Sequence, residues 1–264
     1  MEPDYNFEQM FKEYHGKIYR LALSITRNEK DAEDILQNTF IKILRKIEQF
    51  KNRSKLSTWI YKVAYNEALT LIRKKRRQVN IIDSVDFYTD IIPSGMTVHW
   101  PKIPDQELLD AEMMARVEKV IRHLPIQYRM PLLLQRVEGE SLKTTAEILG
   151  LKINSLKTRL HRAHLYIKNE MDAYRKDRQE DAAAIEIEDK QCPMITQFLY
   201  DYAEDALTAK KKNDFEAHIK ECPPCRTFLA GYSRAIKVTK ALQCNDIPAD
   251  LREKIKTFVS SNSG

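Results

Sequence analysis

A histidine and three cysteines in the last third of the chain have the types and spacing of a metal site. His218 and Cys222 are four residues apart, which places both side chains on one face of a helix. A Pro-Pro pair then predicts a turn out of that helix before Cys225, and Cys192 lies earlier in the sequence. Zinc prefers four tetrahedral nitrogen and sulfur ligands, and a site with all four positions filled is structural. The spacing favours such a site, with chance cysteines beside a surface histidine as the alternative.

The location of the cysteines also bears on the compartment. A disulfide framework spreads cysteines along a chain and accompanies secretion, whereas here they cluster. Residues 1–12 are polar and acidic, without the apolar core and basic lead of a signal peptide. No run of about 18 apolar residues predicts a membrane-spanning helix. We therefore expect a cytoplasmic protein that contacts no membrane, in which Cys244 is a spare thiol.

A second group of functional residues lies between Ser141 and Lys168. Ser141 is placed to cap a helix that Gly150 ends, and Asn154 or Ser155 is placed to cap a second helix. The second helix has an apolar face at Leu156, Leu160, Ala163 and Ile167. Its other face, predicted to be exposed, is basic and carries Lys157, Arg159, His161, Arg162, His164 and Lys168. Two short helices around a glycine turn, the second one basic, are typical of a DNA-binding helix-turn-helix. A solvated basic helix is the alternative.

The N-terminal residues 7–77 also have helical periodicity. One apolar face is formed by Leu36, Phe40, Ile43 and Ile47, and another by Ile60, Ala64, Ala68 and Leu71. Ser57-Thr58 predicts a cap before Trp59. The run from Arg73 to Arg77 consists of five consecutive cations, which suits a nucleic-acid backbone or simply a solvated helix end.

Composition agrees with an all-α fold. The 264 residues include only 6 glycines, too few for the many turns of a sheet-rich protein, and 43% are hydrophobic. Periodicity stops at 78–110, where prolines and acids predict an extended linker. Residues 176–190 are rich in alanine and acids and predict a helical tether, and a last helix is expected from about Pro248.

Two sets of motifs resemble the extracytoplasmic-function (ECF) sigma factors of bacterial RNA polymerase. Residues 123–125, 138–142, 146–150 and 157–163 resemble the region of that family that reads the upstream promoter element. Residues 31–40 resemble the segment that binds the polymerase clamp helices. Ser57-Thr58-Trp59-Ile60, followed by Asn66 and Arg73, resembles the segment that melts and reads the downstream element.

The resemblance implies roles for individual residues. Promoter DNA is expected to contact Trp59, Asn66, Arg73, Lys74, Lys75, Arg76, Arg77, Lys157, Arg159, His161 and Arg162. The RNA polymerase core is expected to contact Asp31, Glu33, Asp34 and Gln37, since acids beside DNA would be repelled. Trp59 can stack on an unpaired base, worth about 1–3 kcal/mol, or be a core aromatic. The acids can instead serve the start of their helix.

The C-terminal motif resembles the zinc-binding anti-sigma domain, in which the four matching positions hold zinc. In this chain they are Cys192, His218, Cys222 and Cys225. Zinc-bound thiolates are oxidisable, so the site could be redox-sensitive. The stretch 180–205 is acidic and predicts an electrostatic contact with the basic helix of the same chain.

The sequence therefore predicts an all-helical protein of several parts. They are a sigma region-two-like promoter-melting domain (1–77), an acidic linker (78–113), a sigma region-four-like helix-turn-helix domain (114–175), a tether (176–190) and a zinc-binding anti-sigma-like domain with a tail (191–264). The predicted function is promoter-specific transcription initiation, with a zinc module that could regulate it in cis. No catalytic triad or phosphate loop predicts an enzyme. The alternatives are a sigma-like sequestering or sensing protein and a regulator that binds DNA without polymerase.

Overall fold

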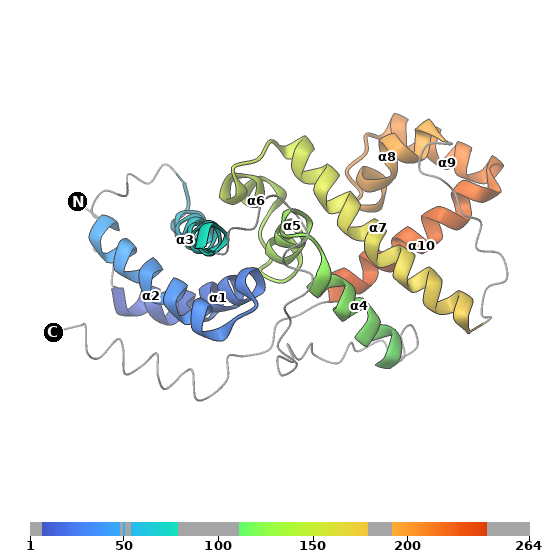
Figure 1. Cartoon of the computed structure of the whole chain (residues 1–264). Coiled ribbons are helices and arrows are strands. Elements are labelled where there is room, and N and C mark those ends of the chain that lie inside the picture. Colours follow the sequence, from blue (N-terminus) through green and yellow to red (C-terminus); the bar gives the residue numbers. More distant parts are fainter. Residues whose placement is uncertain (1–6, 48–49, 51–53, 79–110, 179–191, 242–264) are drawn as a thin grey trace. The chain divides into compact units, whose positions relative to one another are not determined.

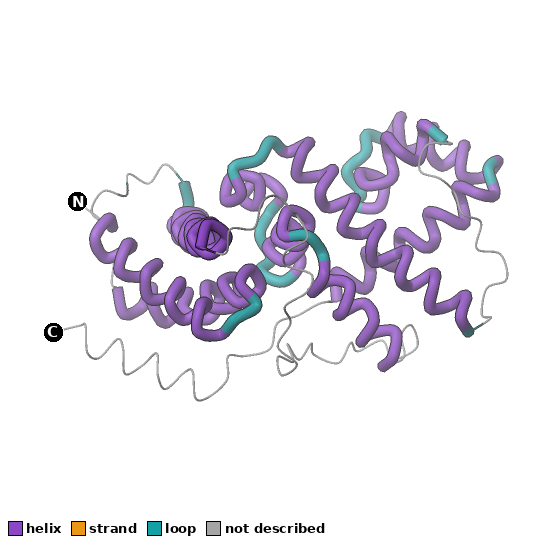
Figure 2. The backbone as a smooth tube through the Cα atoms, viewed as in Figure 1, coloured by secondary structure: helices purple, strands orange, loops and turns teal. Residues whose placement is uncertain are grey.

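The structure is a computed structural model that describes residues 7–47, 50, 54–78, 111–178 and 192–241. Figure 2 shows helices joined by loops and no strand in this part of the chain, which confirms the predicted all-α class. The predictions for most of the linker (79–110), most of the tether (179–190), the helix near Pro248 and the thiol of Cys244 lie outside the described residues.

The helices, which are labelled in Figure 1, fall into two compact units. The first holds α1 (Phe7–Thr26), α2 (Glu29–Lys46), α3 (Leu56–Gln78) and α6 (Leu142–Leu149). In it α1 packs against α2 and α3, α2 packs against α3, and α3 also packs against α6. The predicted apolar faces are confirmed, because Phe40, Ile43, Ile60 and Ala64 are all buried in this core.

The second unit holds α4 (Ala111–His123), α5 (Ile126–Arg136), α7 (Ile153–Asp177), α8 (Pro193–Ala203), α9 (Ala209–Glu221) and α10 (Pro223–Ala241). The long α7 packs against α4, α5 and α10, and α10 also packs against α5, α8 and α9. We call α8–α10 the C-terminal module. The helices α6 and α7, which flank Gly150, belong to different units.

Local side-chain chemistry sets several helix ends. The Ser141 hydroxyl accepts a hydrogen bond from the Thr144 N–H at 3.0 Å, as predicted for a cap. Gly150 ends α6 at φ +65°, a left-handed conformation that glycine adopts without strain. Two other cap predictions are wrong. Because α3 begins at Leu56, Ser57 and Thr58 lie inside its first turn.

The second wrong cap prediction concerns α7, which begins at Ile153. Asn154 and Ser155 therefore lie in the first turn of α7 and do not precede it. The Pro-Pro pair expected only as a turn opens α10, where proline is well suited because the first helical N–H groups need no partner within the helix.

Candidate nucleic-acid interface and metal centre

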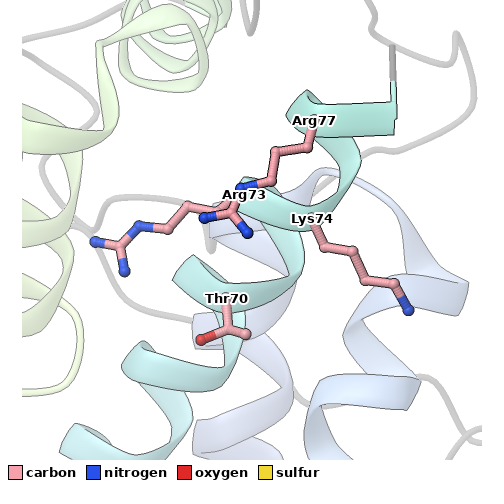
Figure 3. A pocket seen from close by; sticks show the side chains of 4 residues that line it. All are labelled: Thr70, Arg73, Lys74 and Arg77. Atoms are coloured by element: carbon pink, nitrogen blue, oxygen red, sulfur yellow. The ribbon is translucent and has the colours of Figure 1, made fainter. Parts of the chain in front are cut away.

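One face of α3 carries a row of exposed polar and basic side chains. Asn66, Thr70, Arg73 and Arg77 follow one another at steps of four, three and four residues, and all are exposed. Thr70, Arg73, Lys74 and Arg77 line an open pocket of about 540 Å³ (Figure 3). A concave surface with three cations suits a phosphate backbone, which binds cations by releasing its counterions. The structure therefore brings Asn66 and most of the predicted basic run to one surface.

Lys75 takes a different direction from its neighbours. Its Nζ lies 2.5 and 2.6 Å from the two carboxylate oxygens of Asp31 on α2. Lys75 was predicted to contact DNA and Asp31 to contact polymerase, so the structure pairs a residue from each set. Half of the Lys75 side chain remains exposed, so this ion pair contributes little to stability. The side chain of Arg76 lies outside the described part.

Trp59 lies near the start of α3 and is half-buried. Its ring is tilted by 33° against that of Phe50, with centroids 5.2 Å apart. The indole thus has a packing partner on one side and retains an accessible part. This placement allows both sequence interpretations, core packing and stacking on a base.

On α7 the predicted basic face divides into two. The covered part, which we call the docking face, consists of Lys157, His161, His164 and Lys168. His164 is fully buried and Lys168 is 8% exposed, so the prediction that both are exposed is wrong. The physical reason is that α10 packs against α7, a contact that the periodicity of α7 alone does not reveal.

Each residue of the docking face has a defined partner in the C-terminal module. Lys157 Nζ lies 2.8 Å from Asp201 Oδ1 on α8. His161 Nδ1 lies 3.0 Å from the Tyr232 hydroxyl, and His164 Nε2 lies 3.2 Å from the Thr239 hydroxyl. Lys168 Nζ lies 4.4 Å from the centroid of the Phe228 ring, a cation–π contact.

The environment of His164 keeps its imidazole neutral. Burial is the largest cause that lowers its pKa well below the usual value, and the nearby basic side chains of Arg136, His161 and Lys240 lower it further. A neutral imidazole suits a buried interface because it can hydrogen-bond without bringing a charge. Protonation would therefore oppose the packing of α10 on α7.

The other part of the basic face remains open. Arg162 is exposed and donates a hydrogen bond from Nη1 to the Tyr128 hydroxyl of α5 at 3.1 Å. Arg159 is partly exposed. The six residues predicted to form one exposed basic face, four of them expected to contact DNA, are thus distributed over two different surroundings.

The cysteines and histidine of the C-terminal module meet where three helices begin or end. Cys192 precedes α8, His218 lies in the last turn of α9, Cys222 ends α9 and Cys225 lies in the first turn of α10. The ligand atoms of Cys192, His218 and Cys225 all lie within 4.8 Å of one another. Cys192 Sγ is 3.2 Å from His218 Nε2.

The fourth predicted ligand, Cys222, adjoins this group, but its sulfur is not among the atoms that all lie within 4.8 Å of one another. The thiol of Cys225 hydrogen-bonds with Cys222 and Cys192, and burial together with these thiols raises the pKa of Cys225 to about 12. Buried Leu199, Phe215 and Phe228 surround the cluster. The arrangement can hold a metal ion, which would favour the thiolate forms that burial disfavours.

Comparison with known proteins identifies the family. The Sigma-70 region 2 family matches residues 10–78, Sigma-70 region 4 matches 114–164, and a zinc-finger family matches 192–226. The RNA polymerase sigma factor SigV of Bacillus subtilis is 31% identical over 146 residues, which cover 55% of this chain and 79% of SigV. The ECF RNA polymerase sigma factor SigW of the same organism is 29% identical over 164 residues, covering 60% of this chain and 84% of SigW. The chain belongs to the ECF sigma factors of RNA polymerase.

Each family match contains one of the candidate sites of the ECF sigma factor. The region 2 match contains α2 and α3, and the region 4 match ends within α7 at His164. All four predicted metal ligands, three of which form the cluster, lie inside the zinc-finger match. Within the described residues, no helix is both long and apolar enough to cross a lipid bilayer.

On α2, the ECF sigma factor has functional candidates that sequence reasoning missed. Asp34 and Gln37 are exposed, and Glu33 is partly buried. Ile41 and Leu44 follow Gln37 on α2 at steps of four and three residues, and their side chains are 36% and 42% exposed. Neighbouring apolar side chains on one exposed helix face can belong to a protein contact, whereas single exposed ones are ordinary. Their position outside the buried stripe of Leu36 and Phe40 is the signal that could have revealed them.

Proposed function

We propose that this sigma factor directs RNA polymerase to specific promoters through α2, α3 and α7, and that its zinc-binding C-terminal module restrains promoter reading in cis. The polar and apolar row on α2 would bind the polymerase. The cationic pocket on α3 would follow the DNA backbone. The first half of α7 would read the upstream element, because recognition helices contact base edges with their N-terminal residues.

The observation that carries the regulatory half of the proposal is the engagement of α7. Lys157 and His161, two residues expected to read DNA, are bound by Asp201 and Tyr232 of the C-terminal module. A side chain that pairs with an acid is not available to a phosphate or a guanine edge. Displacing the module would expose both residues, so its docking competes with DNA for the same side chains.

Further ion pairs at the same interface support the proposal. The Glu204 carboxylate lies between Arg136 on α5 and Lys240 on α10. Arg234 on α10 lies 3.8 Å from Asp172 on α7. Within the acidic stretch 180–205, Asp201 pairs with the basic helix α7, whereas Glu204 pairs with Arg136 on α5. The more exposed of these pairs should weaken as salt screens their charges.

The metal in this proposal is zinc, held by Cys192, His218, Cys222 and Cys225. Their sulfur and nitrogen donors fit the preference of zinc, and four protein ligands suit a structural role. Bound zinc would supply a fixed link between the ends of three helices. The chain's own residues perform the docking, because α8 and α10 present Asp201, Tyr232 and Thr239 to α7.

The test uses the full chain and two kinds of interface variant. Asp201→Asn removes the partner of Lys157. Gly231→Leu places a bulky side chain where a Cβ would already lie 3.2 Å from Lys168 Cε and 3.3 Å from Asp172 Oδ1. Both variants should raise run-off transcription with core polymerase severalfold, and added salt should reduce the difference for Asp201→Asn.

The matched control is Asp205→Asn, which makes the same charge change at an exposed residue that pairs with Lys212. It should leave transcription unchanged. Metal content should also be unchanged in all three variants, which verifies that the module remains folded. Unchanged or lower transcription in both interface variants would refute restraint in cis and favour a stabilising or recruiting module. A complete lack of transcripts with the unaltered chain would favour the sequestering alternative.

A further inference from the structure

The segment before α6 carries a nearly buried carboxylate at the junction of three elements of the first unit. The side chain of Glu138 is only 6% exposed. Arg20 on α1 donates to both of its carboxylate oxygens, from Nε at 3.2 Å and from Nη2 at 3.3 Å. The hydroxyl of Tyr61 on α3 donates to Oε2 at 2.8 Å, and Tyr61 is 1% exposed.

All of these contacts involve a charged group, and the bond from Tyr61 is the shortest of them. A two-pronged guanidinium–carboxylate pair and a phenol donating to a carboxylate are both charge-assisted hydrogen bonds. Burial and the neighbouring Glu138 carboxylate raise the pKa of Tyr61, so its hydroxyl remains protonated and able to donate. Removing one member would leave buried polar groups without their partners.

The residues that follow Glu138 also interact with the N-terminal helices. Gly139, at φ +69°, turns the chain between Glu138 and Glu140. Burial raises the pKa of Glu140, while Lys17 of α1 and Lys55, which precedes α3, lower it. Beyond this turn, α6 packs against α3. A segment of the region 4 match is therefore attached to helices of the region 2 match by buried polar contacts and by helix packing.

We infer that Glu138 is a latch that holds α6 on the N-terminal helices in the free chain and opens when the chain engages a promoter. The inference rests on the proposed function, in which α3 serves the downstream element and the helix-turn-helix serves the upstream one. A helix-turn-helix docks its first helix across the backbone of the duplex that its second helix reads. While α6 remains attached to α3, it cannot move with α7 to a separate DNA site.

The test compares Glu138→Gln with Glu147→Gln in the full chain. Glu147 is exposed on α6, so this control removes the same charge without touching the latch. Hydrogen exchange of the 142–149 amides in the free chain reports attachment of α6 without reference to DNA or polymerase. Glu138→Gln should accelerate exchange about tenfold, the effect of losing one charge-assisted hydrogen bond. Glu147→Gln should not.

The second measurement is promoter affinity with core polymerase, which should rise severalfold for Glu138→Gln. Tyr61→Phe removes only the hydroxyl and should produce smaller changes of the same sign in both measurements, which guards against misfolding of one variant. Unaltered exchange in both latch variants would overturn the inference, as would faster exchange with unaltered or lower promoter affinity. If the unaltered chain initiates no transcription, the proposed function fails, while the exchange measurement still decides whether Glu138 holds α6.

Discussion

Replacing Glu204 by glutamine should lower the free energy of unfolding more than removing any other single charge at the interface of the C-terminal module with α5 and α7. Glu204 follows α8, and its carboxylate pairs with Arg136 and lies 3.6 Å from Lys240 Nζ. The Arg136 side chain is only 9% exposed and that of Glu204 only 17%. Glutamine keeps an oxygen acceptor and removes the charge that compensates the nearly buried guanidinium.

The size of the effect follows from this burial. Breaking a buried ion pair by removing one partner typically lowers the free energy of unfolding by about 3–5 kcal/mol. Glutamine retains one hydrogen bond and Lys240 is half exposed, so we expect a decrease of about 2 kcal/mol. For a unit of this size, that corresponds to a melting temperature lower by roughly 6–12 °C.

Thermal unfolding of the full chain, followed by circular dichroism, measures the change. Asp205→Asn is the matched control, because the adjacent Asp205 is 84% exposed and pairs only with the exposed Lys212 among the described ion pairs. Asparagine also tolerates the left-handed φ of +52° at this position. Equal melting temperatures for the two variants would refute the reasoning. Replacing both Arg136 and Glu204 by apolar residues should recover much of the loss.

Three further outcomes are expected. Burial lowers the pKa of His164, so its contribution to the free energy of unfolding is complete above about pH 6.5 and is lost as the pH falls toward the lowered pKa. The urea midpoint should therefore fall more steeply between pH 8 and pH 5 in the unaltered chain than in His164→Gln. The reduced protein should contain one zinc per chain by metal analysis, and Cys222→Ser combined with Cys225→Ser should abolish it; a ratio near zero in the unaltered chain contradicts the site. Arg162→Ala should weaken binding to the upstream element about tenfold while polymerase binding persists, and Asp34→Ala should do the reverse, so identical defects would contradict the assignment of roles.

The helical faces and both ends of α6 were predictable because their signals are local, although the caps expected for α3 and α7 were not confirmed. Leu156, Leu160 and Ala163 repeat at helical spacing and are buried, because any partner must cover an apolar stripe. Ser141 and Gly150 act on backbone groups within one turn of themselves, so their residue types were sufficient to place the ends of α6. The metal cluster was predictable for the same reason, because the sequence spacings from His218 to Cys222 and from Cys222 to Cys225 are shorter than two helical turns.

The surroundings of α7 were not predictable in this way. His164 bonds Thr239, 75 residues away, and His161 bonds Tyr232, 71 residues away. A basic side chain on the polar side of a helix has the same periodicity whether water, DNA or another helix covers it. The sequence alone therefore determined the family motifs and most of the helices, and it predicted a metal-ligand set of which three members lie together. Only the tertiary structure decided that α10 covers the docking face, because that depends on which surfaces pack together, and periodicity within one helix carries no information about its partner.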